Sequence, residues 1–168
     1  MTHSPVKILV SVGTQFAFDR LIQIVDDWAA FTPQLRESIM MQVGPGGKLP
    51  AHARSVEFLT PMEYSAAAKT AEVLVAHAGI GSILTAIELG LPVIIFPRSF
   101  ALGEHRNDHQ SSTAREFSLR KGVYLANSAK QLMMLLDNRE KLEFPECGGL
   151  DESFSAKVEE FIKVGLNE

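Results

Sequence analysis

Short apolar runs alternate along the chain with segments whose apolar residues recur every three or four positions. The first run, Val6–Val12, is rich in β-branched residues and is stopped by Gly13, which is typical of a strand buried on both faces of a sheet. The recurring spacing is typical of amphipathic helices. The predicted strands are Val6–Val12, Ser38–Val43, Val56–Leu59, Glu72–Ala76, Val93–Phe96 and Gly122–Leu125. The predicted helices are 61–70, 152–165, Phe18–Phe31, Ile80–Leu89, Asp108–Lys121 and Ser128–Asn138.

This alternation predicts an α/β fold: a doubly wound, parallel, six-stranded Rossmann-like sheet. The 168 residues are expected to form one domain, with a core at about 6–138 and a C-terminal helix at about 152–165. Ligands of such sheets bind beyond the carboxyl ends of the strands, near the point where the strand order reverses. The loops that follow the predicted strands are therefore the ones to search for a site.

Charge and composition narrow the class of partner. The chain has 16 basic and 20 acidic residues and no basic run, so a nucleic acid is not expected. No apolar stretch is long enough to cross a membrane, and the N-terminus does not have the features of a signal peptide. A cytoplasmic protein is expected, and any membrane association would depend on another chain.

The stretch from His77 to Ser82 leads from a predicted strand into a predicted helix and contains two glycines, Gly79 and Gly81. Free backbone amides and the positive end of the helix dipole would face the ligand crevice, which makes an anion site. The simpler alternative is a tight turn that binds nothing. The chain lacks a P-loop motif, and the first strand is not followed by a dinucleotide fingerprint, so NAD binding is not expected.

A polar run from Glu104 to Gln110 follows the fifth predicted strand. Its mixture of donors and acceptors suits a ligand with many hydroxyl groups, and His109 and Gln110 are the candidates to face the crevice. The two histidines of this run have no companion ligand at a suitable spacing, so no metal site is predicted.

Taken together, the motifs HAGIGSILTAIELGLPVIIFPR and DHQ resemble the C-terminal nucleotide-sugar-binding domain of family 28 glycosyltransferases. The beginning, ILVSVGTQFAFDRLIQIVDDWA, is similar to a narrower group in which the two halves of a GT-B glycosyltransferase are separate chains. This group includes the soluble subunit of the eukaryotic UDP-GlcNAc transferase that makes dolichol-linked chitobiose. The form GEHRNDHQ most resembles its bacterial exopolysaccharide members. The resemblance covers roughly residues 7–125.

The resemblance implies a role for each matching position. The diphosphate of a UDP-sugar would meet backbone amides of the glycine turn, with further contacts at the cleft mouth; these residues are Gly79, Gly81, Ser82, Gly13 and Thr14. The uracil would lie beside the strand end at Phe58 and Leu59, and Met62 would pack against the nucleoside. His109 and Gln110 would hydrogen-bond the donor sugar. Gln42 would lie in a second loop of the same cleft.

One position departs from the family pattern. Many relatives have a glutamate that binds the ribose hydroxyls one turn into the helix, where this chain has Thr85. Glu88 follows about one turn later on the same face. Ribose could therefore contact Thr85, or Glu88 could substitute, or Glu88 could be an ordinary surface residue.

The resemblance implies an inverting transfer of a hexose-type sugar to a polyprenyl-linked acceptor, with no cofactor and no metal. The catalytic general base would belong to a membrane-anchored, N-terminal-like subunit, which would hold this chain at the inner face of the membrane. Within this chain, His77 and His109 are the alternative bases. A non-catalytic accessory subunit and a stand-alone enzyme of another doubly wound class are the competing hypotheses.

The identity of the sugar and the oligomeric state stay open at this point. Arg98 or Arg106 could pair with a donor carboxylate, which would favour glucuronic acid. A subunit interface, or a homo-oligomer contact, would be expected around the apolar residues Phe16, Phe18, Phe100 and Leu102.

Overall fold

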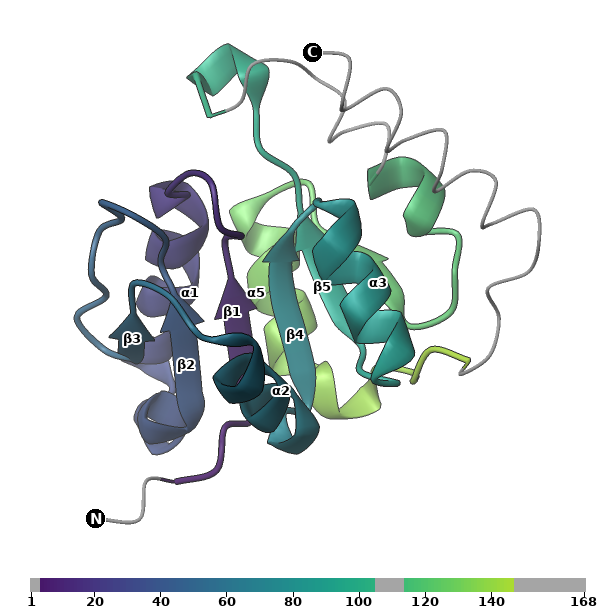
Figure 1. The fold of residues 1–168 in the computed structure, drawn as a ribbon, viewed down its shortest axis with the longest axis horizontal. Coiled ribbons are helices and arrows are strands. Elements are labelled where there is room, and N and C mark those ends of the chain that lie inside the picture. The colour runs from purple at the N-terminus through teal and green to yellow at the C-terminus, as the bar shows by residue number, and fades with distance from the viewer. Residues whose placement is uncertain (1–3, 105–113, 147–168) are drawn as a thin grey trace.

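The computed structural model describes residues 4–104 and 114–146, which form one sheet with helices on both faces (Figure 1). The strands are β1 (Ile8–Ser11), β2 (Ile39–Gln42), β3 (Arg54–Val56), β4 (Val73–His77), β5 (Val93–Phe96) and β6 (Val123–Leu125). The α-helices are α1 (Asp19–Phe31), α2 (Pro61–Thr70), α3 (Ile80–Glu88) and α5 (Ala129–Asp137), and residues 114–117 are also helical. Short 3₁₀ helices are η1 (Pro33–Ser38), η2 (Phe100–Leu102) and η3 (Arg139–Lys141).

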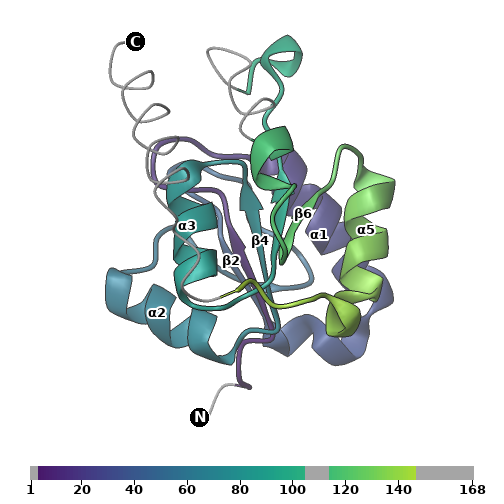
Figure 2. The same ribbon diagram turned by 90° about the vertical axis from the view of Figure 1, so that its right-hand side faces the viewer.

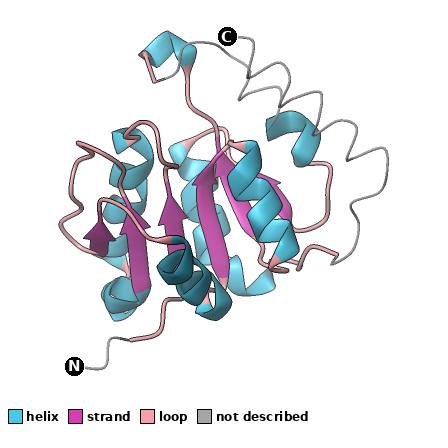
Figure 3. Cartoon of the chain, viewed as in Figure 1, coloured by secondary structure: helices cyan, strands magenta, loops and turns pink. Residues whose placement is uncertain are grey.

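All neighbouring strands are parallel, in the order β3-β2-β1-β4-β5-β6 (Figure 3). The chain builds outward from β1 to β3 and then returns to the other side of β1 with β4, so the order reverses between β1 and β4. Helices α1 and α5 lie on one face of the sheet, and α2 and α3 lie on the other (Figure 2). The predicted fold class, a doubly wound parallel six-stranded sheet, is confirmed.

The apolar runs are explained by burial on both faces. Along β1, Ile8 and Val10 pack into the core under α1 and α5, whereas Leu9 packs into the core under α2 and α3. All three are fully buried. Each strand therefore needs apolar side chains at successive positions, which produces a continuous run instead of an alternating pattern.

Several predicted boundaries are wrong. The third strand lies at Arg54–Val56 instead of Val56–Leu59, because residues 57–60 leave the sheet and lead into a capped helix. Thr60 and Glu63 form a capping box there, in which the hydroxyl and the carboxylate each accept a backbone N–H. The helix predicted to end at Lys121 ends at residue 117. Its first part and the predicted helix 152–165 lie outside the described residues.

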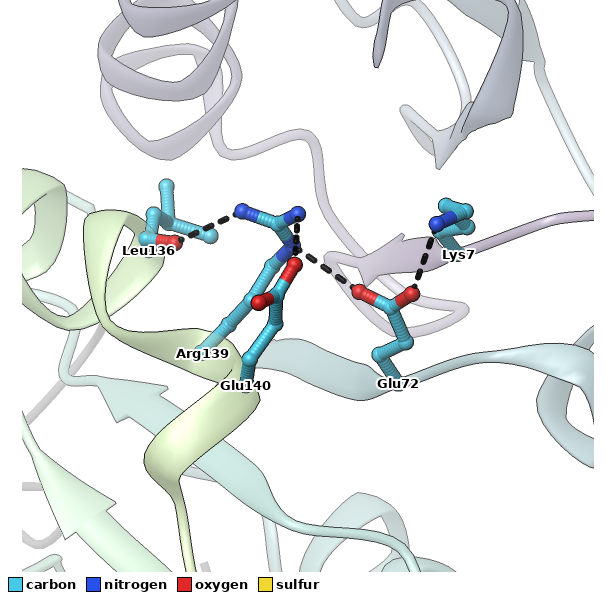
Figure 4. Close-up of polar contacts among 5 residues, drawn as sticks. All are labelled: Lys7, Glu72, Leu136, Arg139 and Glu140. Atoms are coloured by element: carbon cyan, nitrogen blue, oxygen red, sulfur yellow. Dashed lines mark hydrogen bonds and ion pairs between the residues drawn. The ribbon is translucent and has the colours of Figure 1, made fainter.

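An ion-pair cluster ties the sheet to a helix at the end opposite the cleft described below (Figure 4). The Glu72 carboxylate, just before β4, contacts Lys7 Nζ at 2.9 Å and Arg139 Nε at 3.0 Å. Arg139 also contacts Glu140 at 3.2 Å and donates to the Leu136 carbonyl at 3.3 Å. The cluster joins the starts of β1 and β4 to η3.

We expect Glu72→Gln to lower the free energy of unfolding by about 0.5–1 kcal/mol at neutral pH, a value reduced by partial solvent screening. Burial raises the pKa of Glu72, but hydrogen bonds and charges from Lys7 and Arg139 outweigh burial and hold it below the usual 4.5. A lowered folded-state pKa stabilises the protein above the unfolded pKa, and this contribution is lost as the pH falls through the folded value. Urea unfolding should show a larger difference at pH 7 than at pH 3, and Glu140→Gln, altering a more exposed carboxylate, is the control.

Candidate functional site

A cleft of about 660 Å³ lies at the carboxyl ends of β1, β2 and β4, beside the point where the strand order reverses. Ligands of doubly wound sheets bind at such a position. The loop after β1, the segment between β3 and α2, and the first turns of α3 form its walls. The lining residues with sequence-predicted roles are Gly13, Thr14, Phe16, Gln42, Phe58, Leu59, His77, Gly81, Ser82, Thr85, Glu88 and Arg98. Gly79, also predicted to bind the diphosphate, is not among the lining residues.

The N-terminus of α3 lies at this cleft. Gly79 is the N-cap, with extended backbone (φ −85°, ψ 134°), and the helix begins at Ile80. The amides of a first helical turn have no carbonyl partner inside their own helix, and they lie at the positive end of its dipole. Gly81 and Ser82 from this turn line the cleft, so it has the elements of an anion site.

The position of the His77 side chain explains why two residues near the cleft, Gly13 and Gly79, are glycines. Its imidazole lies between the loop after β1 and the start of α3. A Cβ at Gly79 would overlap the imidazole Nε2, and a Cβ at Gly13 would lie 2.7 Å from Cε1. Gly13 also has a φ of +87°, which disfavours any other residue. These two glycines are required by packing within the protein itself.

Gly81 is different, because among residues 4–104 and 114–146, its own stretch of helix aside, a Cβ there would meet no atom within 4 Å. Its φ is not positive, so the backbone conformation does not demand glycine either. An alanine would be more favourable in a helix by roughly 1 kcal/mol. A glycine that the protein does not need, at the start of a helix that lines a cleft, leaves room for a ligand to approach the backbone.

Side chains at successive turns of α3 continue the cleft wall beyond Ser82. The Thr85 hydroxyl donates to the Gly81 carbonyl at 2.8 Å, so its proton is used within the helix while its oxygen can still accept. Glu88 is exposed and lines the cleft one turn further on. The structure therefore presents both candidates for the ribose hydroxyls on one helix face.

The opposite wall is the segment that joins β3 to α2. Phe58 is 52% exposed and lines the cleft beside the buried Leu59. Met62 is 80% exposed and does not line the cleft, so the structure does not bring it to the expected nucleoside contact. Sequence reasoning missed Tyr64 and Ser65, which line the cleft from α2. Tyr64 and Ser65 follow Pro61 by three and four residues, so they lie on the same face of the predicted helix, and this spacing could have identified them.

Two arginines organise the rim of the cleft. Arg98 is 3% exposed and donates to the carbonyls of Val12 at 2.9 Å, Phe16 at 2.8 Å and Ala17 at 2.6 Å. Arg20 holds the Glu104 carboxylate with two contacts of 2.7 Å and donates to the Pro97 carbonyl at 3.1 Å. The expectation that Arg98 pairs with a donor carboxylate is replaced by a structural role in holding the loop after β1.

The Glu104 carboxylate completes this arrangement. Burial raises its pKa, but hydrogen bonds from Arg20 and the Ser99 amide, with the charges of Arg20 and Arg98, outweigh burial and hold it below its usual value. Glu104 directly precedes the segment that contains Arg106, His109 and Gln110, which lies outside the described residues. The sugar-binding role predicted for His109 and Gln110 therefore stays a prediction.

The proposed interface residues separate into two groups. Phe18 is 1% exposed and packs against Phe96, with ring centroids 6.0 Å apart, so its assignment to a surface patch is wrong. Phe16, Phe100 and Leu102 are 48%, 56% and 64% exposed. An apolar residue near a helix start can be either a core residue or a surface contact, and only the packing distinguishes the two.

Within residues 4–104 and 114–146, no cluster of three potential His, Cys, Asp or Glu metal ligands is found. In the same part of the chain, no helix combines the length and apolar character that crossing a membrane requires. The site described above can bind an anion with backbone amides and can cover an apolar or aromatic ring.

Comparison with protein families matches residues 7–143 to the glycosyltransferase family 28 C-terminal domain. The match spans most of the chain, and the chain therefore belongs to this family. Its fold is that of the C-terminal half of GT-B glycosyltransferases. A comparison with curated protein sequences gives no match.

Solved structures of similar fold include an NMR structure of ALG13, with 17% identity and a TM-score of 0.61 over 92% of this chain and 94% of that one. The glycosyltransferase of kitacinnamycin has 15% identity and a TM-score of 0.59, over 92% of this chain and 38% of its own. MurG of Acinetobacter baumannii has 19% identity and a TM-score of 0.54, over 84% and 44%. This chain thus spans less than half the length of the last two. At such identities the likeness shows the fold alone.

Proposed function

We propose that this chain is the donor-binding part of an inverting glycosyltransferase that transfers a hexose-type sugar from a UDP-sugar. The observation that carries the proposal is Gly81, which lines the cleft at the N-terminus of α3. A Cβ there would meet no atom of the part of the chain that the structure describes, beyond the nearby helix backbone. Backbone amides at that position can hold a diphosphate without a metal ion. Membership of family 28 supports the same class of activity.

The catalytic demand of this reaction is to stabilise the charge that develops on the leaving nucleoside diphosphate. Preorganised amides at a helix N-terminus meet it, because they are already oriented before the bond breaks. In the proposal, the amides around Gly81 and Ser82 take the diphosphate, with Gly13 and Thr14 at the mouth of the cleft. Phe58 and Leu59 border the uracil, and Thr85 or Glu88 takes the ribose.

We propose further that the general base comes from a separate, membrane-anchored subunit that presents a polyprenyl-linked acceptor in exopolysaccharide synthesis. The described cleft offers few candidates of its own. Among the residues that line it, the side chains with a group that could accept a proton from the acceptor are His77, packed against two glycines, and Glu88 at the end of α3. In this proposal the chain acts peripherally at the inner face of the membrane through that partner.

A second candidate function is an accessory subunit that activates a partner without binding a donor. The observation that favours it is Thr85, which replaces the family's ribose-binding glutamate and already uses its proton on Gly81. A weakened ribose contact would be tolerated in a subunit whose site is not used. Nucleotide affinity distinguishes the two functions.

The test is calorimetric titration with UDP, UDP-glucose, UDP-glucuronic acid and UDP-GlcNAc, first without metal and then with magnesium. We expect UDP to bind without metal, and Ser82→Tyr to weaken binding at least tenfold because the added ring fills the cleft beside the amides. Ser118→Tyr, a change that does not touch the cleft lining, should leave affinity unchanged. Absence of UDP binding to the unmodified chain would contradict donor binding and favour the accessory function.

A further inference from the structure

Two polar side chains are buried at the carboxyl ends of otherwise apolar strands. Ser11 ends β1, Gln42 ends β2, and each is 3% exposed. The two residues are direct partners in the parallel pairing of these strands, so they lie side by side beneath the cleft. Buried polar groups in a sheet are costly unless they are hydrogen-bonded, and both of these are.

Gln42 joins the two walls of the cleft. Its side-chain Nε2 donates to the Gly13 carbonyl at 3.1 Å, and its Oε1 accepts the Leu59 amide at 3.0 Å. Gly13 belongs to the loop after β1, on the diphosphate side of the proposed site. Leu59 belongs to the segment between β3 and α2, on the nucleoside side. One amide side chain therefore fixes how these two backbone segments lie relative to each other.

Ser11 makes a second, parallel connection between the same two segments. Its hydroxyl oxygen accepts the Gly13 amide at 3.4 Å. The same hydroxyl acts on the phenol of Tyr64 on α2 and lowers its pKa, against the larger rise that burial causes. Both backbone polar groups of Gly13 are thus held by side chains that reach the segment 59–64. The Gln42 connection has the shorter distances and is the stronger of the two.

The geometry of a ligand that spans both walls depends on these connections. The nucleoside of a UDP-sugar would lie against Phe58 and Leu59, and its diphosphate would lie between Gly13 and Gly81. A ligand that occupies only one wall needs no particular separation between them. A ligand that occupies both gains from walls that are already at the correct spacing, because ordering them costs binding free energy otherwise.

We propose that Gln42, assisted by Ser11 and Tyr64, is a positioning residue that couples the nucleoside half of the donor site to the diphosphate half. This inference rests on the proposed function, since it assumes a nucleoside diphosphate as ligand. It assigns these residues no contact with the reacting atoms. The coupling makes UDP bind more tightly than the separate affinities of its two halves would give.

The test is an amide NMR titration with uridine, pyrophosphate and UDP, applied to Gln42→Met and Tyr64→Phe. Gln42→Met keeps the length of the side chain and removes both hydrogen bonds, and Tyr64→Phe removes only the phenol hydroxyl. Matched controls are Gln23→Met, whose amide bonds Asp27 and Lys48, and Tyr124→Phe, whose hydroxyl accepts the Glu143 amide. Neither control residue lines the cleft.

We expect Gln42→Met to weaken UDP about tenfold and Tyr64→Phe about threefold, while uridine and pyrophosphate each change less than twofold. Uridine should shift the Gly13 amide resonance in the unmodified chain and in both controls, but not in Gln42→Met. A residue with a merely structural role would lower thermal stability without changing this pattern. If Gln42→Met does not fold, the test rests on Tyr64→Phe: a threefold weakening of UDP, with uridine and pyrophosphate unchanged, supports the inference.

Two outcomes overturn the inference, and they are distinguishable. If the unmodified chain does not bind UDP, the proposed function fails and this inference fails with it. If UDP binds but Tyr64→Phe and Gln42→Met behave like their controls, or weaken all three ligands equally, only the coupling is disproved.

Discussion

Replacing Arg98 with methionine is expected to lower the free energy of unfolding by about 3–5 kcal/mol, which is a large share of the total stability of a typical domain. The guanidinium is buried and serves three backbone carbonyls, those of Val12, Phe16 and Ala17. Methionine fills similar space but offers no donor. The carbonyls would then lose their charged hydrogen-bond partner, which costs more than the bonds contribute in net terms.

The same substitution removes two further interactions. Arg98 lies over the Phe18 ring, with its Cζ 4.6 Å from the ring centroid, and its charge acts on Glu104. Arg20 and Glu104 keep their own two contacts of 2.7 Å, so the rim is weakened and not abolished. The loop after β1 should loosen most, because its carbonyls are the groups released.

Thermal unfolding should show a melting temperature about 10 °C lower for Arg98→Met, since each kcal/mol shifts it by roughly 2–4 °C in a domain of this size. Binding of UDP, measured well below that temperature, should also weaken, because Gly13 and Thr14 lie in the loosened loop. Arg115→Met, at an exposed arginine, is the matched control and should change neither quantity. A melting temperature within about 2 °C of the unmodified protein would contradict the structural role of Arg98.

Alanine at Gly79 and alanine at Gly81 are expected to have opposite effects, although the two positions are separated by a single residue. At Gly79 the added Cβ would overlap the His77 imidazole, so the ring or the helix start must move and stability should fall by about 1–3 kcal/mol. At Gly81 the Cβ meets no described residue within 4 Å outside its own helix turn, and alanine suits a helix better by up to about 1 kcal/mol. Gly81→Ala should therefore keep or raise the stability.

The effect on nucleotide binding should not follow the effect on stability, because Gly81→Ala should weaken UDP binding although it does not destabilise the protein. Gly81→Ala places a methyl group in the open cleft where the diphosphate is proposed to meet the backbone, and we expect UDP affinity to fall about tenfold in a protein that is at least as stable. Denaturant unfolding and calorimetric titration on the same samples separate the two effects. A Gly81→Ala protein that binds UDP as well as the unmodified chain would place the ligand away from the start of α3.

Local sequence patterns were sufficient for most of the fold. The strand at Val93–Phe96 was predicted with its observed bounds, because a short apolar run between proline residues leaves little choice of register. Pro61 was correctly placed at the start of a helix. The third strand was misplaced because Phe58 and Leu59, shortly after Val56, are also apolar. After the strand ends, the Leu59 amide bonds the Gln42 side chain of β2 instead of a backbone partner.

Local propensity and motifs of adjacent residues are enough to predict the doubly wound sheet, the family and the glycine turn at the start of α3. The three-dimensional packing was needed to show that Gly13 and Gly79 serve contacts with His77 while Gly81 faces the open cleft. It likewise showed that Arg98 serves carbonyls more than 80 positions earlier in the chain. The space around a Cβ and the partner of a buried charge are set by residues remote in sequence, which no local pattern records.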